Sequence, residues 1–234
     1  MGMMTFDLAI ENREAKVTPA MGACPRDMKI HGMNGLLKRV FDIAVASLAL
    51  LYLAPLMLIV AIALKIEGGS VFYKQERVGR SGKRFAMWKF RSMHPNSDQL
   101  LLNLLATSKS AAQEWEQYQK LRNDPRITPI GNLIRKTSID ELPQLFNVIM
   151  GEMSVVGQRP ILPHQTETYG PHLPGYMRSR PGITGLWQIS GRSALTFEDR
   201  ASIGSEYVNQ WSLFRDFKIL LLTIPVVLFS RDAY

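Results

Sequence analysis

The sequence predicts a mixed α/β protein, mainly helical, with a re-entrant membrane helix hairpin and a small cytosolic domain. Three observations lead to this fold class: a long apolar run near the N-terminus, a pair of aromatic-rich segments typical of a β-hairpin, and several later segments with helical periodicity. We expect a flexible tail over residues 1–34, the membrane helix over 35–68 and the cytosolic domain over 69–234.

The composition of the tail and of the whole chain narrows the function classes. Residues 1–34 mix Gly, Met, Pro and charged residues without periodicity, which is typical of a flexible tail. The chain has 28 Lys and Arg against 20 Asp and Glu, a net charge of +8. This balance favours phosphate substrates, acidic lipid headgroups or nucleic acid as partners. The single cysteine, Cys24, excludes an internal disulfide framework.

The apolar run from Val40 to Leu64 contains one charged residue, Asp42, and one proline, Pro55. At ~1.5 Å per residue its helix is long enough to cross a hydrocarbon core of about 30 Å. A proline kinks or breaks a helix, and the basic residues at both ends of the run favour a cytosolic position. We therefore predict a re-entrant hairpin that turns at Pro55, with a kinked single span and a buried helix of a soluble core as the alternatives.

Two strand-like segments follow, residues 71–73 and 85–90, joined by the turn-forming residues 79–82. They predict a β-hairpin with aromatic side chains at its base. Lys89 and Arg91 end the second strand as two cations on one face, where they can meet lipid headgroups or a substrate phosphate.

The remaining elements are predicted from periodicity and from helix stop signals. Residues 158–191 are rich in Pro and Gly and predict mostly loop. Residues 211–229 predict an amphipathic helix, which fits the membrane interface and packing on the core about equally well. The other predicted helices cover residues 98–122, 129–136 and 139–150, the last ending at Gly151.

The segment from Ser138 to Pro143 opens the last of these helices with two adjacent acids, Asp140 and Glu141. Ser138 and Glu141 have the spacing of a capping box, and acids in a first helical turn complement the helix dipole. The second interpretation is chemical. One carboxylate attacks phosphorus while its neighbour holds Mg²⁺, and the amides of the helix start attract the phosphate.

Arginines near and beyond this segment supply the positive charge that a phosphate site needs. The planar guanidinium suits two phosphate oxygens at once, although each arginine taken singly is more typical of a solvated surface charge. Trp187 fits a nucleobase stack or the core, and the core is favoured. The arginines concerned are Arg135, Arg159, Arg178, Arg180 and Arg192.

Together these motifs resemble the bacterial sugar transferase family, the monotopic polyprenyl-phosphate phosphoglycosyl transferases. The resemblance covers residues 36 to about 230, and in combination the motifs are highly specific. Among the members, the short form that starts exopolysaccharide repeat units is the most similar. The matching stretches are Lys38–Asp42, Lys89–Met93, Asp124–Thr128, Ser138–Asn147, Gly151–Pro160 and Arg180–Arg192.

The resemblance implies a reaction, a cofactor and site residues. A UDP-sugar, with glucose or galactose expected, gives its sugar-1-phosphate to undecaprenyl phosphate and releases UMP. Asp140 would be the nucleophile that forms a covalent phosphosugar intermediate, and Glu141, beside Asp140, would bind the required Mg²⁺. The candidate phosphate-binding residues are Arg135, Arg159, Arg180, Arg192, Lys89 and Arg91.

Two departures from the family pattern are visible. Gln158 stands where a proline is common, which predicts a looser turn before Arg159, and Ala54 precedes Pro55 where a serine is common. The resemblance places the chain on the cytoplasmic face of the bacterial inner membrane, with membrane lipid as a partner, no nucleic acid and a possible homo-oligomer. The competing hypotheses are a non-catalytic membrane adaptor that binds anionic lipid or a polysaccharide assembly complex and, more distantly, a nucleic-acid-binding protein.

Overall fold

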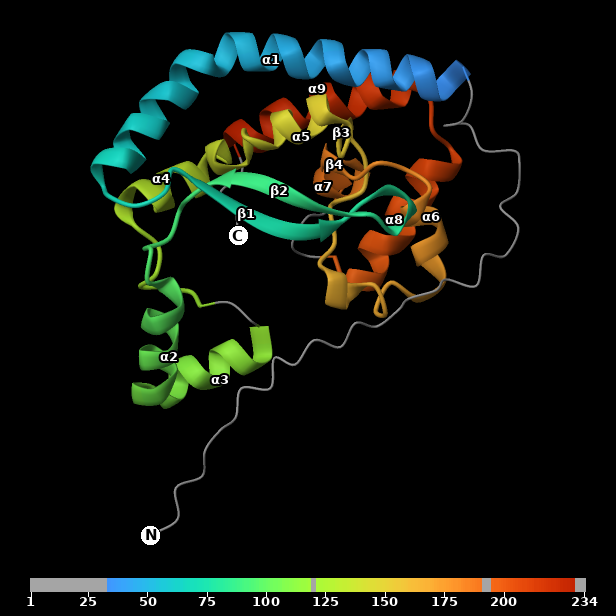
Figure 1. Ribbon diagram of the computed structural model, residues 1–234. Coiled ribbons are helices and arrows are strands. Elements are labelled where there is room, and N and C mark those ends of the chain that lie inside the picture. Colours follow the sequence, from blue (N-terminus) through green and yellow to red (C-terminus); the bar gives the residue numbers. More distant parts are fainter. Residues whose placement is uncertain (1–32, 119–120, 191–194, 230–234) are drawn as a thin grey trace.

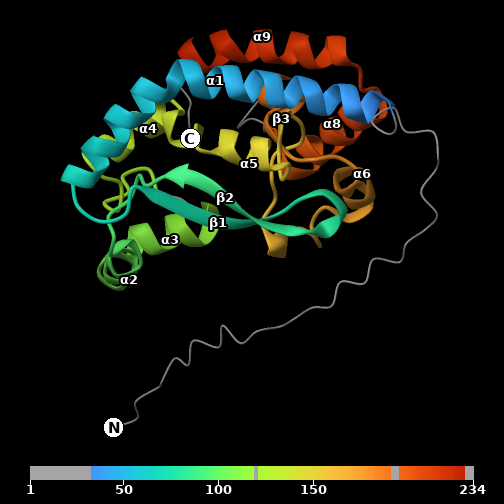
Figure 2. The same cartoon turned by 45° about the horizontal axis from the view of Figure 1, so that its top comes forward.

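The computed structural model describes residues 33–118, 121–190 and 195–229 (Figure 1). A long helix, α1, lies along a small domain built from two short sheets and further helices. Nearly all of the predicted tail lies outside the described residues. In both views α1 and α9 lie side by side over α5, and the β-hairpin lies on the other side of α5 (Figures 1 and 2).

Helix α1 (Met33–Ile66) begins and ends two residues earlier than the predicted 35–68 and continues through Pro55. Figure 1 shows a bend between its blue and its cyan parts. The predicted reversal at Pro55 is thus a bend within one helix, because a proline removes one backbone hydrogen bond and the turns on either side keep theirs. Its apolar window has a mean hydropathy of 2.5 and is only 17 % buried, so α1 is not the core helix of a soluble protein. The re-entrant course of α1 in a membrane stays a prediction.

The one acid in the apolar run faces the domain. Asp42 is fully buried and lies 3.3 Å from the ammonium group of Lys38. Lys38 also contacts Asp216 on α9 (Leu213–Phe229), 2.6 Å away. Because Tyr207 and Trp211 both donate hydrogen bonds to Asp216, one buried network joins α1 to the C-terminal helices.

The predicted β-hairpin is confirmed as β1 (Phe72–Val78) and β2 (Arg84–Phe90), paired antiparallel around a short turn, η1 (Arg80–Gly82). Because side chains alternate across a strand, the register puts one set of residues on a single face of the hairpin. This set comprises Tyr73, Gln75, Arg77, Phe85, Met87 and Lys89.

A second sheet pairs β3 (Ser154–Val156) with β4 (Gly182–Thr184) in parallel. The prediction of loop for residues 158–191 is therefore wrong in part. Three-residue strands are too short to show a periodic pattern. The chains can approach because a Cβ on Gly182 would collide with the backbone of Gly157. The segment also contains η3 (Pro163–Gln165), η4 (Gly170–His172), α6 (Leu173–Met177) and α7 (Leu186–Ser190).

The helix predicted over residues 98–122 is two helices, α2 (Ser97–Thr107) and α3 (Lys109–Tyr118). Ser108 between them is extended, and its hydroxyl accepts a hydrogen bond from the amide of Ala111. A serine that caps the following turn competes with a continuous helix, which explains the break.

Of three later helices, one is confirmed, one is divided in the structure and one was not predicted. Helix α4 (Pro129–Lys136) is confirmed and begins at Thr128, whose side chain accepts from the amide of Gly131. The helix predicted over 139–150 is instead η2 (Ile139–Glu141) followed by α5 (Gln144–Met150), which stops at Gly151 with φ 87°. Helix α8 (Phe197–Asn209) was not predicted, although Thr196 and Asp199 form a capping box at its start.

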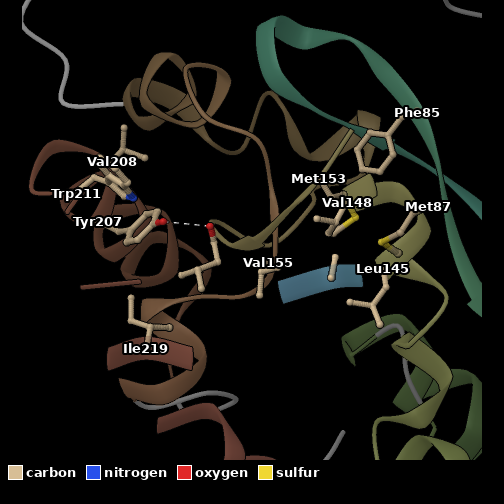
Figure 3. Packing of buried hydrophobic residues seen from close by; sticks show 12 residues of the cluster. Phe85, Met87, Leu145, Val148, Met153, Val155, Tyr207, Val208, Trp211 and Ile219 are labelled. Atoms are coloured by element: carbon tan, nitrogen blue, oxygen red, sulfur yellow. Dashed lines mark hydrogen bonds between the residues drawn. The ribbon is translucent and has the colours of Figure 1, made fainter. Parts of the chain in front are cut away.

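The main core joins these elements (Figure 3). Tyr207 of α8, Ile219 of α9 and Trp211 from the loop between these helices lie on one side of Val155, while the hairpin and α5 contribute from the other. The hydroxyl of Tyr207, whose proton is shared with Asp216, also lies 3.1 Å from the carbonyl oxygen of Val156. This packing fixes β3 and with it the loop that carries Arg159.

Candidate active site

The two adjacent acids lie on η2, directly after a residue with an unusual backbone. Ser138 has φ 56° and ψ 15°, the left-handed region that costs a non-glycine residue energy. Its side chain makes no capping bond, so the predicted capping box between Ser138 and Glu141 is wrong. The left-handed turn ends α4 and redirects the chain so that Asp140 and Glu141 face the hairpin.

Lys89 of β2 holds both carboxylates. Its Nζ lies 2.7 Å from Glu141 Oε1 and 3.6 Å from Asp140 Oδ2. Asp140 is buried and Glu141 is partly buried. We call Asp140, Glu141, Lys89 and Arg159 the carboxylate site, since Arg159 Nη2 also approaches Glu141 Oε1, at 3.6 Å.

The environment shifts the pKa values of the two acids in opposite directions. Burial raises the pKa of Asp140, and the negative charge of Glu141 adds to this against the pull of Lys89. Burial also opposes ionisation of Glu141, but Lys89 and Arg159 outweigh it and lower the pKa of Glu141 to about 2. Adjacent acids with separated pKa values can perform different tasks, one as a more basic nucleophile and one as a permanent anion.

Two of the predicted arginines lie at this site. Arg159 has a side chain that is 46 % exposed, so its guanidinium can reach an incoming ligand. Arg135 donates from Nε to the hydroxyl of Ser92, 2.8 Å away, and its charge acts on Asp140. Both therefore lie near the carboxylates, as predicted.

Arg77 is a member of the site that the sequence analysis missed. It lines a small cavity together with Glu141, Arg159 and Gly182. Its guanidinium donates to the carbonyl of Pro160 at 3.0 Å, and its buried Nε has no partner among the described residues. Burial and the charge of Arg159 lower the pKa of Arg77 to about 10. The hairpin register could have found it, because Arg77 shares a face with Lys89.

Two other predicted phosphate-binding residues, Arg91 and Arg180, are not brought to this site. Arg91 is buried and donates to the carbonyls of Leu64 and Gly68, so it holds the C-terminal end of α1. Arg180 donates to the carbonyl of Gly151 and lines a different cavity. Arg192 lies outside the described residues.

Two further residues have clear positions. Trp187 is buried, with the guanidinium of Arg200 5.0 Å from its ring centre, which confirms the core interpretation. Gln158 is also buried. Its backbone carbonyl accepts from Gly182, and its side-chain oxygen accepts from Tyr169. Gln158 therefore ties the turn before Arg159 to its surroundings on both sides.

The described residues can take part in a magnesium site but do not form a complete one. Within residues 33–118, 121–190 and 195–229, no three His, Cys, Asp or Glu side chains gather as a metal cage. Mg²⁺ commonly takes one or two protein carboxylates and completes its shell with water and substrate phosphates. Glu141, kept ionised by its low pKa, and the adjacent Asp140 fit that donor set.

Comparisons with known proteins identify the family of this chain. The family model described as bacterial sugar transferase matches residues 33–230. The exopolysaccharide production protein ExoY of Rhizobium meliloti is 46% identical over 206 residues, which cover 88% of this chain and 91% of that protein.

Two longer relatives carry names that state a reaction. The undecaprenyl-phosphate galactose phosphotransferase of Salmonella typhimurium is 48% identical over 85% of this chain and 42% of its own length. The UDP-glucose:undecaprenyl-phosphate glucose-1-phosphate transferase of Escherichia coli is 38% identical over 89% of this chain and 44% of its own length. This chain thus spans less than half of these two proteins. By the match over residues 33–230 and the identity to these relatives, the chain belongs to the bacterial sugar transferase family.

Proposed function

We propose that this protein transfers a hexose-1-phosphate, from UDP-glucose or UDP-galactose, to undecaprenyl phosphate and releases UMP. The observation that carries the proposal is the pair of acids with opposite pKa shifts, held by Lys89 and Arg159 at the end of a strained turn. The names of the relatives from Salmonella typhimurium and Escherichia coli support both the lipid acceptor and the hexose.

In the first step, a carboxylate oxygen of Asp140 attacks the phosphorus that carries the sugar. A bond forms between this oxygen and phosphorus, and the phosphoanhydride bond to the uridine-bearing phosphate breaks, so UMP leaves with the electron pair. The product is an acyl phosphate that joins Asp140 to the sugar-1-phosphate. The raised pKa of Asp140 makes its carboxylate a better nucleophile once it is ionised.

The cations of the site have separate tasks. Lys89 holds both acids and lies where it can neutralise phosphate oxygens. Arg159 and Arg77 line the same cavity and can bind the diphosphate before and during the attack. Glu141, with Asp140, would hold Mg²⁺, which neutralises phosphate charge when it is bound.

In the second step, an oxygen of the lipid phosphate attacks the same phosphorus, and the carboxylate of Asp140 leaves. The products are the undecaprenyl diphosphate sugar and the free enzyme. This order requires a nucleotide sugar from the cytosol and a lipid phosphate from the membrane to use one site in turn.

The surface of α1 supports a position at the membrane. Several of its large apolar side chains are exposed, among them Leu51, Tyr52 and Ile59. Helix α9 beside it exposes Phe214 and Phe217 as well, as expected for an interfacial amphipathic helix.

Both ends of α1 are held by the same domain. Lys38 near its start contacts β3 and α9, and the carbonyl of Leu64 near its end accepts from Arg91 after β2. A helix with both ends on one body is better suited to enter and leave one leaflet than to cross the bilayer. We propose the cytoplasmic face of the bacterial inner membrane as its location, since the basic residues at both ends of the apolar run favour the cytosolic side.

The substitution Asp140→Asn tests the reaction. In membranes supplied with UDP-sugar, undecaprenyl phosphate and Mg²⁺, we expect this variant to release no UMP and to retain no radiolabelled phosphosugar on the protein. Glu76→Gln is the matched control and should keep full activity, because this exposed acid on β1 has Arg84 as its one ion-pair partner among the described residues. Full UMP release by Asp140→Asn would refute the nucleophile. A wild-type protein that never retains label and never releases UMP would instead be the non-catalytic adaptor.

A further inference from the structure

A second basic cavity lies at the N-terminal end of α1. It has a volume of about 330 Å³, the lower end of the range for ligand pockets. Four guanidinium groups line it, those of Arg39, Arg80, Arg178 and Arg180, and we call it the arginine pocket. It shares no lining residue with the cavity at Glu141.

Among the described residues, the acid that lines this pocket does not pair with Arg39, Arg80 or Arg180. Asp42 is the one acid among the described residues that line the pocket, and its Oδ1 is engaged by Lys38, Ser154 and the amide of Val155. Lys38 in turn is balanced by Asp42 and Asp216. In the part of the chain that the structure describes, Arg39, Arg80 and Arg180 form no ion pair.

The contacts of these arginines leave donors for a ligand. Arg39 donates to the carbonyls of Val148 and Ile149 at the end of α5, and Arg180 donates from Nε to the carbonyl of Gly151. These bonds to neutral carbonyls orient the guanidinium groups without neutralising them. Burial, together with Arg39 and Arg80, lowers the pKa of Arg180, as expected for a cation among unbalanced cations.

Two residues that line the pocket each have a buried polar atom without a hydrogen-bond partner among the described residues. These atoms are Oδ2 of Asp42 and Oγ of Ser179. Both residues are more than nine-tenths buried. Buried polar atoms are almost always paired, so an unpaired acceptor and an unpaired hydroxyl indicate a polar ligand. Such a ligand would carry an anionic group for the arginines and a hydroxyl that donates to Asp42.

The position of the pocket indicates where the ligand comes from. Leu36 lines the pocket and is 60 % exposed, the adjacent Leu37 is 48 % exposed, and Val40 on the next turn is 57 % exposed. Basic pockets beside membrane helices on the cytoplasmic side are suited to lipid headgroups. We propose that the arginine pocket binds the phosphodiester headgroup of an anionic glycerophospholipid whose headgroup carries a free hydroxyl. This site lies apart from the proposed transfer reaction and does not depend on it.

Vesicle binding by the full chain, without substrate, tests the proposal. The probe is phosphatidylcholine vesicles with or without phosphatidylglycerol, and the measured quantity is the ratio of the two binding constants. Arg80→Gln in the hairpin turn should lower this ratio about fivefold more than the matched control Arg84→Gln. Arg84 carries the same charge four residues later but is exposed and outside the pocket. Equal losses in both variants would overturn the pocket and leave only diffuse attraction of a basic surface.

Further measurements test whether the ligand is a lipid headgroup or free phosphate, and they check that each variant folds. Ser179→Ala keeps the charge and should weaken the preference for phosphatidylglycerol without changing binding to pure phosphatidylcholine. An unchanged preference in this variant would count against a ligand inside the cavity.

Inorganic phosphate, titrated into the protein in detergent, should bind no better to wild type than to Arg80→Gln. The lipid assignment is wrong if inorganic phosphate binds only to wild type while wild type and Arg80→Gln show the same preference for phosphatidylglycerol vesicles. The ligand is then free phosphate. Thermal unfolding in detergent confirms that each variant folds.

Discussion

The carboxylate site and the arginine pocket are both rich in positive charge, but their counter-charges lie in different places. At the carboxylate site Lys89 and Arg159 lie directly against Glu141. In the arginine pocket the one lining acid, Asp42, is engaged by Lys38, and Arg80 has no ion pair among the described residues. The first arrangement prepares groups for a reaction, and the second leaves a positive field that an outside anion can neutralise.

The two sites also differ in how the backbone presents them. The carboxylates lie together on η2, a three-residue turn that follows the strained Ser138. The arginines come from distant parts of the chain: α1, the hairpin turn and the segment after α6. A local, strained presentation gives fixed geometry to reacting atoms, whereas a pocket shared by several elements can bind a ligand and join those elements together.

The largest expected effect comes from removing the charge that neutralises Asp42. Lys38→Met leaves Asp42 and Asp216 buried without their cation, and breaking such a pair typically costs about 3–5 kcal/mol. We expect the free energy of unfolding to fall by that amount, measured by chemical denaturation in detergent. Lys83→Met, an exposed lysine in the hairpin turn, is the control and should change stability little. A stable Lys38→Met would mean that the arginines already neutralise Asp42, and the comparison of the two sites would fail.

The transfer rate at the carboxylate site and lipid binding at the arginine pocket should respond differently to pH. Asp140 must be ionised to attack, and its pKa is raised above the ordinary value of 3.8, so the transfer rate should fall as pH drops through this raised pKa. The loss approaches tenfold per pH unit, about 1.4 kcal/mol. Glu141 stays ionised throughout because its pKa is about 2.

Arginine does not deprotonate between about pH 5 and 8, so the preference for phosphatidylglycerol should stay constant over the same range. Parallel measurements of UMP release and vesicle binding check both halves of this prediction. A transfer rate that is flat down to pH 4 would contradict the raised pKa of Asp140.

The sequence was most informative where patterns are long or local. The apolar run, the hairpin, α4 and the stop at Gly151 were all predicted, because each has a strong local signal. The short parallel strands β3 and β4 were missed, since their pairing depends on glycines that let two distant backbones approach. At Pro55 the structure has a bend within one continuous helix, and the re-entrant course in a membrane stays a prediction.

The candidate site shows the same limit. Asp140, Glu141, Lys89 and Arg159 were predicted and lie together. Arg91 and Arg180 were predicted to bind the substrate phosphate but face other partners, because residue type and motif do not specify direction. Arg77 was missed because its position at the site follows from the register of the hairpin, and that register is a property of two paired strands.

The smallest expected effect concerns the strain at the carboxylate site. Ser138 and Ser81 are the non-glycine residues with positive φ in the described part of the chain, at 56° and 59°. Ser81 lies in the hairpin turn next to Arg80, so the two residues carry similar strain near different sites. Because glycine adopts this backbone freely, Ser138→Gly and Ser81→Gly should each gain about 0.5–1 kcal/mol in unfolding free energy.

Only Ser138→Gly should also lower turnover, by a few-fold, because a looser turn fixes Asp140 less firmly against Lys89. Denaturation curves and UMP release for both variants measure the two effects separately. If both variants gain stability and both keep full turnover, the strain at Ser138 is a by-product of ending α4. If only Ser138→Gly is slower, the strained turn serves the positioning of Asp140, and the difference between the two sites extends from their charges to their backbones.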